Sequence, residues 1–207
     1  MIQFRHGFYA DVRTEDRSRT TITYKSGALE EMKTRVERRA FIRVYDGKMW
    51  YYSSVTDLAH LQKTLDGLYD AATPNADIQN DPVVRRFERN RDTLLSFADS
   101  SVRDIPSKDK QALLLSYLPL LSEDSCITMP RGTYLDRNSL FRFRSSLGAD
   151  ITYDYQTCGL SFACDMTEGE KKFSGHWQKG ATRFDELKGL DDEIRAAMAE
   201  QTAFMRN

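Results

Sequence analysis

The chain has 207 residues, with 30 Lys and Arg against 31 Asp and Glu, so its net charge is −1. This value excludes the strongly basic character of a general nucleic-acid or membrane-surface binder. With 40% apolar residues and 10 Tyr, 11 Phe and 2 Trp, it has too much apolar surface for a disordered protein. No apolar run approaches the ~20 residues that span a bilayer, and the first residues lack the apolar segment of a signal peptide. Three Cys, an odd number, fit a reducing compartment. We therefore expect a soluble, cytoplasmic protein with a single domain over residues 1–207.

Two local clusters of arginine interrupt this balance, and acids are interspersed with both. We interpret them as solvated charged faces and expect no direct contact with nucleic acid or membrane. The clusters are Arg35, Arg38 and Arg39, and then Arg85, Arg86, Arg89 and Arg91.

The chain opens with strand patterns in which apolar residues alternate with polar ones. Lys25-Ser26-Gly27 is typical of a hairpin turn, and the charged, irregular stretch from Leu29 to Arg39 is typical of an exposed or edge strand. Asp46-Gly47 predicts a two-residue hairpin that leads into a strand over Met49–Ser54. The alternating positions are Phe8, Ala10 and Val12, then Ile22 and Tyr24, then Ala40, Ile42 and Val44.

Two helices follow these strands. The first begins at a cap provided by Asp57 or Thr56 and ends at Pro74-Asn75. The stretch Asn75–Asn90 is polar and reads as a loop or a short exposed helix. Ser107 is expected to cap the second helix, which Pro119 kinks or shortens. The apolar stripes are Leu58, Leu61, Leu65, Leu68 and Ala72 in the first helix, and Leu114, Leu118 and Leu121 in the second.

The second half again predicts strands, with turns at Leu147-Gly148 and Glu168-Gly169 and a last helix from Phe184 or Asp191 to Met205. The order of strands, two helices, strands and a helix predicts an α+β fold with a largely antiparallel sheet and about three packing helices. The expected strands are Ser125–Met129, Leu140–Arg144, Ile151–Tyr155, Leu160–Cys164 and a return strand over Lys172–Gln178.

Common catalytic motifs are missing from the sequence. His6, His60 and His176 are far apart and none is followed by Glu, so there is no H-E-x-x-H pair for zinc, and we read Asp57 with His60 as a surface pair. Ser161 lies in an approximate G-x-S-x-G, but no helix follows it, so we expect a strand residue. Neither a P-loop nor a G-x-G-x-x-G motif occurs. We therefore expect no catalytic, cofactor or metal site in this chain.

Adjacent acids and the cysteines add no site either. We interpret Glu30-Glu31 as solvated surface and Asp191-Asp192-Glu193 as a helix N-terminus, where negative charge is favoured. Side chains that are adjacent in sequence point apart, so neither run forms a paired-carboxylate site. Cys158 and Cys164 lie six positions apart on one strand face. At ~20 Å they can neither pair nor share a metal unless the strand bends sharply.

Two blocks of the chain resemble the TldD/PmbA family of zinc metallopeptidases, whose members are also described as modulators of DNA gyrase. In the first block, the family's YAEVR-like strand is matched by Tyr9–Arg13 and its G-x-x-E turn by Gly27–Glu31. Its R-V-x-x-D-G-x-x-G-F-A-S-x-x-D-L segment is matched by Arg43–Leu58. In the second block, Phe141–Gly175, Arg144–Gly148 resembles its N-S-x-G turn. Trp50-Tyr51-Tyr52 departs from the family's small residue followed by an aromatic, and most of the family's leading helix is missing.

The resemblance implies the N-terminal, non-catalytic domain of a longer two-domain protein, inactive alone. Zinc would be held by the absent C-terminal domain in the catalytic branch, and the partners would be another TldD/PmbA-type subunit, as a homo- or heterodimer, and flexible peptide substrates. The residues that match the family motifs, to which we assign structural roles, are Asp11, Arg13, Gly27, Glu30, Arg43, Gly47, Trp50, Ser53, Asp57, Ser146 and Gly148.

The Leu29–Arg39 stretch is our candidate edge for pairing with an extended peptide, through Leu29, Glu31, Lys33 and Arg35. The alternative at this position is an ordinary solvated hairpin. For the whole chain, the alternatives are a stand-alone interaction or peptide-binding module, and a hydrolase that uses Ser161 or His176.

Overall fold

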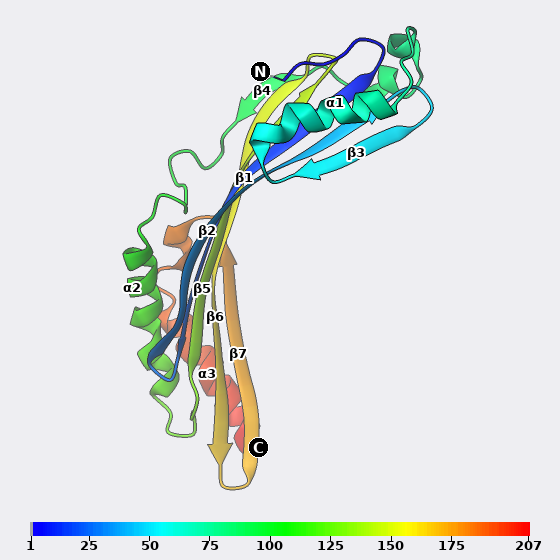
Figure 1. Ribbon diagram of the computed structural model, residues 1–207. Helices are drawn as coiled ribbons and strands as arrows, with labels where there is room; N and C mark the ends of the chain where they lie inside the picture. Colours follow the sequence, from blue (N-terminus) through cyan, green and yellow to red (C-terminus); the bar gives the residue numbers. More distant parts are fainter. Residues whose placement is uncertain (1) are drawn as a thin grey trace. The chain divides into compact units, whose positions relative to one another are not determined.

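The computed structural model describes residues 2–207 and contains a seven-stranded sheet with three α-helices among the described residues. Figure 1 shows the strand order β3-β2-β1-β5-β6-β4, with β7 beside β6. The β2–β3 and β6–β7 pairs are antiparallel, whereas the short β4 runs parallel to β6. The predicted α+β class with a largely antiparallel sheet is confirmed. The strands are β1 (Tyr9–Lys25), β2 (Ala28–Tyr45), β3 (Trp50–Val55), β4 (Arg91–Leu94), β5 (Arg131–Ser145), β6 (Asp150–Glu168) and β7 (Lys171–Ala181), and the helices are α1 (Leu61–Ala71), α2 (Ser107–Tyr117) and α3 (Asp191–Arg206).

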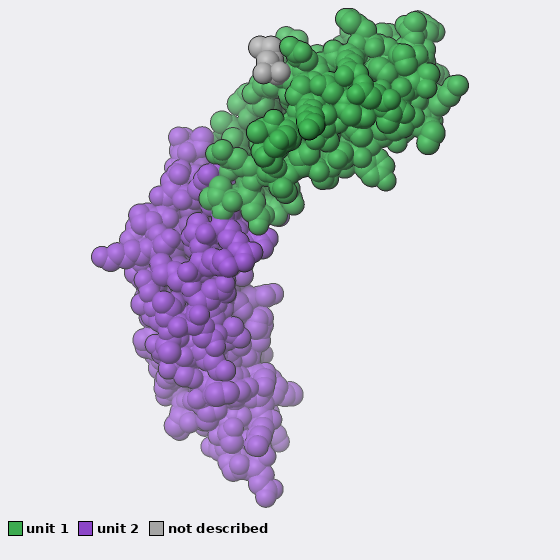
Figure 2. Space-filling model, in the orientation of Figure 1, with its two compact units in different colours: residues 1–17, 36–96, 139–155 green, residues 18–35, 97–138, 156–207 purple. Residues whose placement is uncertain are grey.

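The chain divides into two compact units, each assembled from three separate segments (Figure 2). Unit 1 comprises residues 1–17, 36–96 and 139–155, and unit 2 comprises residues 18–35, 97–138 and 156–207. Strands β1, β2, β5 and β6 contribute residues to both units. This division into compact units does not test the expectation of a single domain over residues 1–207, which stays a prediction.

The first core of unit 1 forms between α1 and the sheet. The predicted stripe is confirmed, because Leu61 and Leu65 are buried against the alternating residues of β1 and β2. Asp57 accepts a hydrogen bond from the Ala59 amide at 3.0 Å and so caps the 3₁₀ turn Leu58–His60 that leads into α1. The sheet residues in this core are Phe8, Ala10, Val12, Ala40, Ile42 and Val44.

The other face of β1 in unit 1 is covered as well. Tyr9 packs with Tyr45, Ile78 and Val84, so the segment that the sequence predicts as a loop or exposed helix covers a second core with two 3₁₀ turns, Ile78–Asn80 and Val84–Arg86. The predicted alternation of apolar and polar residues is present at the start of β1, but the residues on both faces are buried there because both faces are covered.

Unit 2 has one apolar core to which both of its α-helices contribute. Leu114 of α2 and Ile194 of α3 belong to the same cluster as Phe162 in β6 and Trp177 in β7. The β6 residues in the cluster alternate, because successive side chains of a strand point to opposite faces. These residues are Cys158, Leu160, Phe162, Cys164 and Met166.

The strands differ from the expectation in three places. The segment Ser125–Met129 forms only an isolated bridge between Ile127 and Met166, because Asp124 turns the chain by accepting hydrogen bonds from Cys126 and Ile127. The segments expected at residues 151–155 and 160–164 form one strand, β6. Strand β4 was not predicted, since none of its four residues is buried.

The turns confirm the glycine pattern but correct one detail. Ser26 and Gly27 have φ values of 47° and 80°, as a tight hairpin requires, and Gly148 and Gly169 also have positive φ. The β2–β3 loop has four residues, not two, because Asp46 accepts hydrogen bonds from the amides of Lys48 and Met49, both at 2.8 Å.

The predicted cap of α2 is also wrong. Ser107 is the first helical residue and makes no capping hydrogen bond, because Pro106 occupies the cap position and its carbonyl accepts the Lys110 amide. Pro119 shortens the helix as expected, since a 3₁₀ turn, Leu118–Ser122, follows Tyr117. The sequence predicts that the last helix starts at Phe184 or Asp191. A 3₁₀ turn, Phe184–Leu187, starts at the first of these residues, and α3 starts at the second. Within residues 2–207, no helix has the length and apolar character to cross a bilayer.

Candidate functional site

The motif residues Asp11, Arg43 and Trp50 meet in unit 1. Neighbouring strands bring Asp11 of β1 opposite Arg43 of β2, whose Nε and Nη2 donate to its carboxylate at 3.0 and 2.7 Å. Tyr9 donates its hydroxyl to the same carboxylate at 3.1 Å, and the Arg43 guanidinium lies 4.9 Å from the centre of the Trp50 ring. Burial, followed by the Asp11 charge, raises the pKa of Tyr9. The phenol is therefore held as a neutral donor, and the cluster joins β1, β2 and β3.

The other motif residues form turns, caps and pairings apart from this cluster. Ser146 accepts the Ala10 amide through its hydroxyl at 3.0 Å and donates its own amide to the Ala10 carbonyl at 2.8 Å. Gly47 and Gly148 supply turns with positive φ, Asp57 is the cap described above, and Ser53 lies opposite Ile42 in the β2–β3 ladder. Gly27 and Glu30 lie in unit 2, where Glu30 pairs with Arg131 at 3.1 Å. The structural roles assigned to these residues stay a prediction.

Arg13, the remaining motif residue, is exposed and lines a hollow of about 570 Å³ in unit 1. Glu15 and Arg39 line the same hollow, with Phe41 and Phe141. Glu15 accepts hydrogen bonds from Arg17 at 2.8 Å, from Arg39 at 2.7 Å and from the Ser139 hydroxyl at 2.9 Å. Burial by itself raises the pKa of Glu15, but these three donors outweigh it and hold the pKa at about 2.

The low pKa of Glu15 predicts an acid-sensitive contribution to stability. The pKa falls from an ordinary 4.5 to about 2 on folding, so the contribution is complete above the ordinary pKa and is lost as pH falls toward the folded one. We expect the difference in unfolding free energy between the native chain and Glu15→Gln to shrink between pH about 5 and about 3, measured by urea unfolding. The exposed Glu200→Gln variant is the control. A difference that does not change with pH would contradict this assignment.

The candidate pairing edge lies in the first part of β2. Every residue from Ala28 to Arg39 is exposed, including the apolar Leu29, Met32 and Val36. Strand β3 pairs with β2 only through Ala40–Tyr45, so among the described strands none lies along the outer side of the preceding segment. Its outer main-chain groups are therefore available to an added strand. Leu29, Glu31, Lys33 and Arg35 all lie in this segment, within unit 2.

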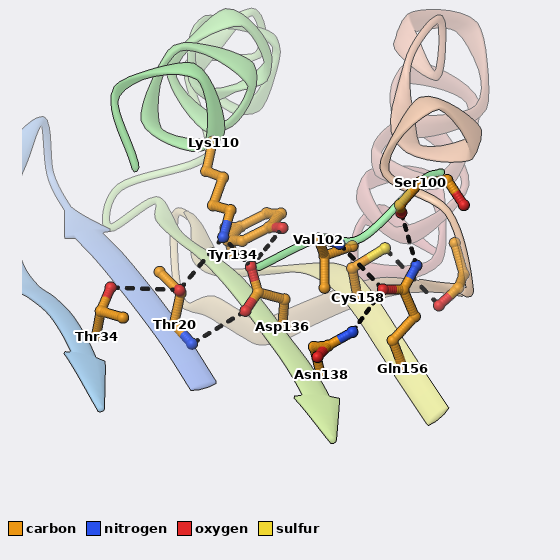
Figure 3. Close-up of polar contacts among 11 residues, drawn as sticks. Thr20, Thr34, Ser100, Val102, Lys110, Tyr134, Asp136, Asn138, Gln156 and Cys158 are labelled. Carbon is orange, nitrogen blue, oxygen red and sulfur yellow. Dashed lines mark hydrogen bonds and ion pairs between the residues drawn. The ribbon is translucent and has the colours of Figure 1, made fainter. Parts of the chain in front are cut away.

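A buried ion pair in unit 2 was missed by sequence reasoning (Figure 3). Lys110 of α2 and Asp136 of β5 lie 2.6 Å apart, with side chains only 2% and 1% exposed. Asp136 also accepts the Tyr134 hydroxyl at 2.9 Å and the Thr20 amide at 3.1 Å. One signal was present in the sequence: Lys110 precedes Leu114 and Leu121 at helical spacing, on the stripe that faces the core.

Gln156 of β6 organises a second buried polar group in unit 2 (Figure 3). Its side-chain oxygen accepts hydrogen bonds from the Val102 amide at 3.0 Å and from Asn138 at 3.1 Å. Its side-chain nitrogen donates to the carbonyls of Ser100 and Thr182 at 2.9 and 2.7 Å. Because all four contacts are made, Gln156 ties the segment before α2 to β5 and to the chain after β7.

The residues considered for catalysis lie apart from these groups. Ser161 is a strand residue, as predicted, and its hydroxyl lies 3.3 Å from Nε2 of His176 on β7 in an exposed position. His60 lies 2.8 Å from the Asp57 carboxylate, also exposed. The three cysteines are free and buried. Over residues 2–207 no group of three or more His, Cys, Asp or Glu side chains is arranged to hold a metal ion.

Comparison with known proteins finds a family model that matches part of the chain and solved structures with a similar fold. Residues 10–72 match the family model of the PmbA/TldA metallopeptidase domain 1, and no curated protein sequence matches the chain. A structure from Thermotoga maritima, described as a candidate modulator of a DNA gyrase, is similar with a TM-score of 0.70 and 18% identity, over 95% of this chain and 44% of that one.

Two further structures are similar. A candidate modulator of DNA gyrase from Bacteroides thetaiotaomicron has a TM-score of 0.68 and 16% identity, over 94% of this chain and 45% of that one. TldE from Thermococcus kodakarensis has a TM-score of 0.69 and 8% identity, over 94% and 44%. The chain therefore spans less than half the length of each of these three solved structures. The resemblance to the N-terminal domain of TldD/PmbA proteins is confirmed.

Proposed function

We propose that this chain works as a non-catalytic part of a TldD/PmbA-type metallopeptidase in the cytoplasm. The proposal is supported by its fold, which is that of the N-terminal domain of TldD/PmbA proteins, and by the match of residues 10–72 to the family's domain 1 model. Its role is to contribute to subunit assembly and to bind or admit flexible peptide substrates. Zinc and peptide cleavage belong, in this proposal, to a further domain. The partner is another TldD/PmbA-type subunit, the same or different.

The observation that carries the peptide part of the proposal is the exposed segment Ala28–Arg39 of β2. An extended peptide that pairs with a strand edge gains main-chain hydrogen bonds whatever its sequence, which suits flexible and varied substrates. The charged residues Glu31, Lys33 and Arg35 limit uncontrolled pairing between copies of the chain. The edge therefore combines availability for a peptide with resistance to aggregation.

Hydrogen exchange tests this edge directly. On addition of an extended peptide of Thr and Val, we expect the amides on the outer side of Ala28–Arg39, which alternate along the strand, to exchange more slowly. The amides of β7, which lies at the other edge of the sheet in unit 2, should not change. The measurement is residue-resolved exchange by NMR.

A peptide with the same side chains but with alternate backbone nitrogens methylated is the matched control, because it cannot form the ladder. It should give no protection. Equal protection by both peptides, or protection spread over β7, would reject the β2 edge as the peptide site.

The alternative is a stand-alone interaction or peptide-binding module without enzymatic activity. The same β2 edge favours it, since pairing needs no further domain. The gene separates the two readings: a reading frame that continues past Asn207 into a histidine-containing domain supports the peptidase subunit, and a stop codon there supports the module.

A further inference from the structure

Unit 2 contains an open groove of about 760 Å³ that the proposed function does not use. It is lined by the segment before α2, by the first half of α2 and by the turn before α3. Its volume is in the range of about 300–1,000 Å³ that is usual for ligand sites. The apolar part of its lining is Ala98, Ile105, Pro106, Ala112, Leu113 and Phe184.

The charged part of the groove is strongly one-sided. Four aspartates line it, Asp99, Asp104, Asp109 and Asp185, against the single cation Lys188. Asp185 is paired with Lys188 at 2.6 Å. Within residues 2–207, no cationic side chain pairs with the other three carboxylates. The groove is therefore an apolar surface bordered by three carboxylates that pair with no cation among the described residues, with the Arg183 guanidinium at its margin, where it donates to Ser100 at 2.6 Å.

Lys188 shows how this groove accommodates a cation. Its Nζ lies 2.6 Å from the Asp185 carboxylate and 5.6 Å from the centre of the Phe184 ring, so one ammonium group contacts a carboxylate and an aromatic face together. Similar contacts are open to an added lysine or arginine, whose aliphatic stem would cover the apolar lining.

We propose that this groove binds a segment of a partner polypeptide in which lysine or arginine alternates with apolar side chains. A basic peptide satisfies both parts of the lining, since its cations neutralise the aspartates and its apolar side chains cover Ile105, Leu113 and Phe184. A bare metal ion would leave the apolar part uncovered, and an acidic chain or a nucleic acid would be repelled. The inference uses only residues of unit 2 outside β2, so it stands apart from the peptide edge.

The test uses the full chain and two fluorescein-labelled peptides of equal length, one of alternating lysine and leucine and one of alternating glutamate and leucine. Fluorescence anisotropy should show binding of the lysine peptide that weakens as salt is added, and no binding of the glutamate peptide.

Variants connect the binding to the groove. Asp104→Asn/Asp109→Asn should weaken binding of the lysine peptide about fivefold, whereas Asp191→Asn/Asp192→Asn should not change it. The control is matched, because Asp109 and Asp191 both lie in the first turn of a helix. Ala112→Arg places a cation in the groove and should weaken binding about tenfold, compared with the exposed Ala203→Arg on α3.

Circular dichroism and urea unfolding should show that all four variants remain folded, because each change lies on an exposed position. Binding that is equal for the two peptides, that is absent for the lysine peptide at low salt, or that is unaffected by both groove variants would overturn the proposal.

Discussion

Lys110→Met is expected to lower the free energy of unfolding by about 3–5 kcal/mol, because it removes one partner of a buried ion pair and leaves the other charged. The Asp136 carboxylate would keep its bonds from Tyr134 and Thr20 but lose the cation 2.6 Å away, with almost no access to water. The reporter is Trp177 in unit 2, followed by fluorescence during urea unfolding in a Trp50→Phe background.

The control for this change is Lys108→Met, two residues away on α2 and exposed, which should change the unfolding free energy by less than about 1 kcal/mol. A double-mutant cycle with Asp136→Asn should show strong coupling, since the second change costs little once the first has removed the pair. Additive effects, or a loss no greater than that of Lys108→Met, would mean that the pair does not hold α2 to the sheet.

The second large effect is expected at Asp11. Asp11→Ala should lower the unfolding free energy by about 3 kcal/mol, since it removes the acceptor for the Tyr9 hydroxyl and for Nε and Nη2 of Arg43. Tyr9 is only 1% exposed, so its hydroxyl has little access to solvent that could replace the carboxylate. Trp50 lies next to Arg43 and reports unfolding of unit 1 in a Trp177→Phe background.

Asp150→Ala is the matched control for Asp11→Ala. Asp150 also accepts two hydrogen bonds from one arginine, Arg142, but both side chains are well exposed, so the loss should be below about 1 kcal/mol. Equal losses for the two variants would show that the burial of the Asp11 cluster contributes nothing to its strength.

Much of the fold could be predicted because local patterns and tertiary structure agree. Ala40, Ile42 and Val44 alternate in the sequence and lie together under α1, whose own stripe at Leu61 and Leu65 meets them. The hairpins at Gly27, Gly148 and Gly169 follow from backbone conformations that glycine adopts without strain.

The features that could not be predicted lack such a local signal. Strand β4 is four exposed residues held by parallel pairing with β6, which only the folded chain brings alongside. Lys110 is charged, and charged residues are normally assigned to the surface, so its place on an apolar stripe was overlooked. The alternating pattern of β1 also carries no signal that Tyr9 and Asp11 are buried, because the segments that cover this face of the strand come from elsewhere in the chain.

The candidate site was predictable in outline only. The charged, irregular composition of Leu29–Arg39 indicates an exposed strand, and that stretch is exposed in β2. The acidic groove of unit 2 combines side chains from α2 with the turn at Phe184, which are about seventy residues apart in the chain. No spacing rule in the sequence joins them.

The division of each unit into three chain segments constrains the order in which the protein can form during synthesis. Unit 1 needs the β5–β6 residues up to Tyr155 before its set of strands is complete, although its first segment ends at Arg17. Unit 2 needs α3, at residues 191–206. Since domains generally fold as units as the chain emerges from the ribosome, neither unit can be complete when only β1 and β2 have been made. Unit 1 waits for Tyr155, and unit 2 waits for α3.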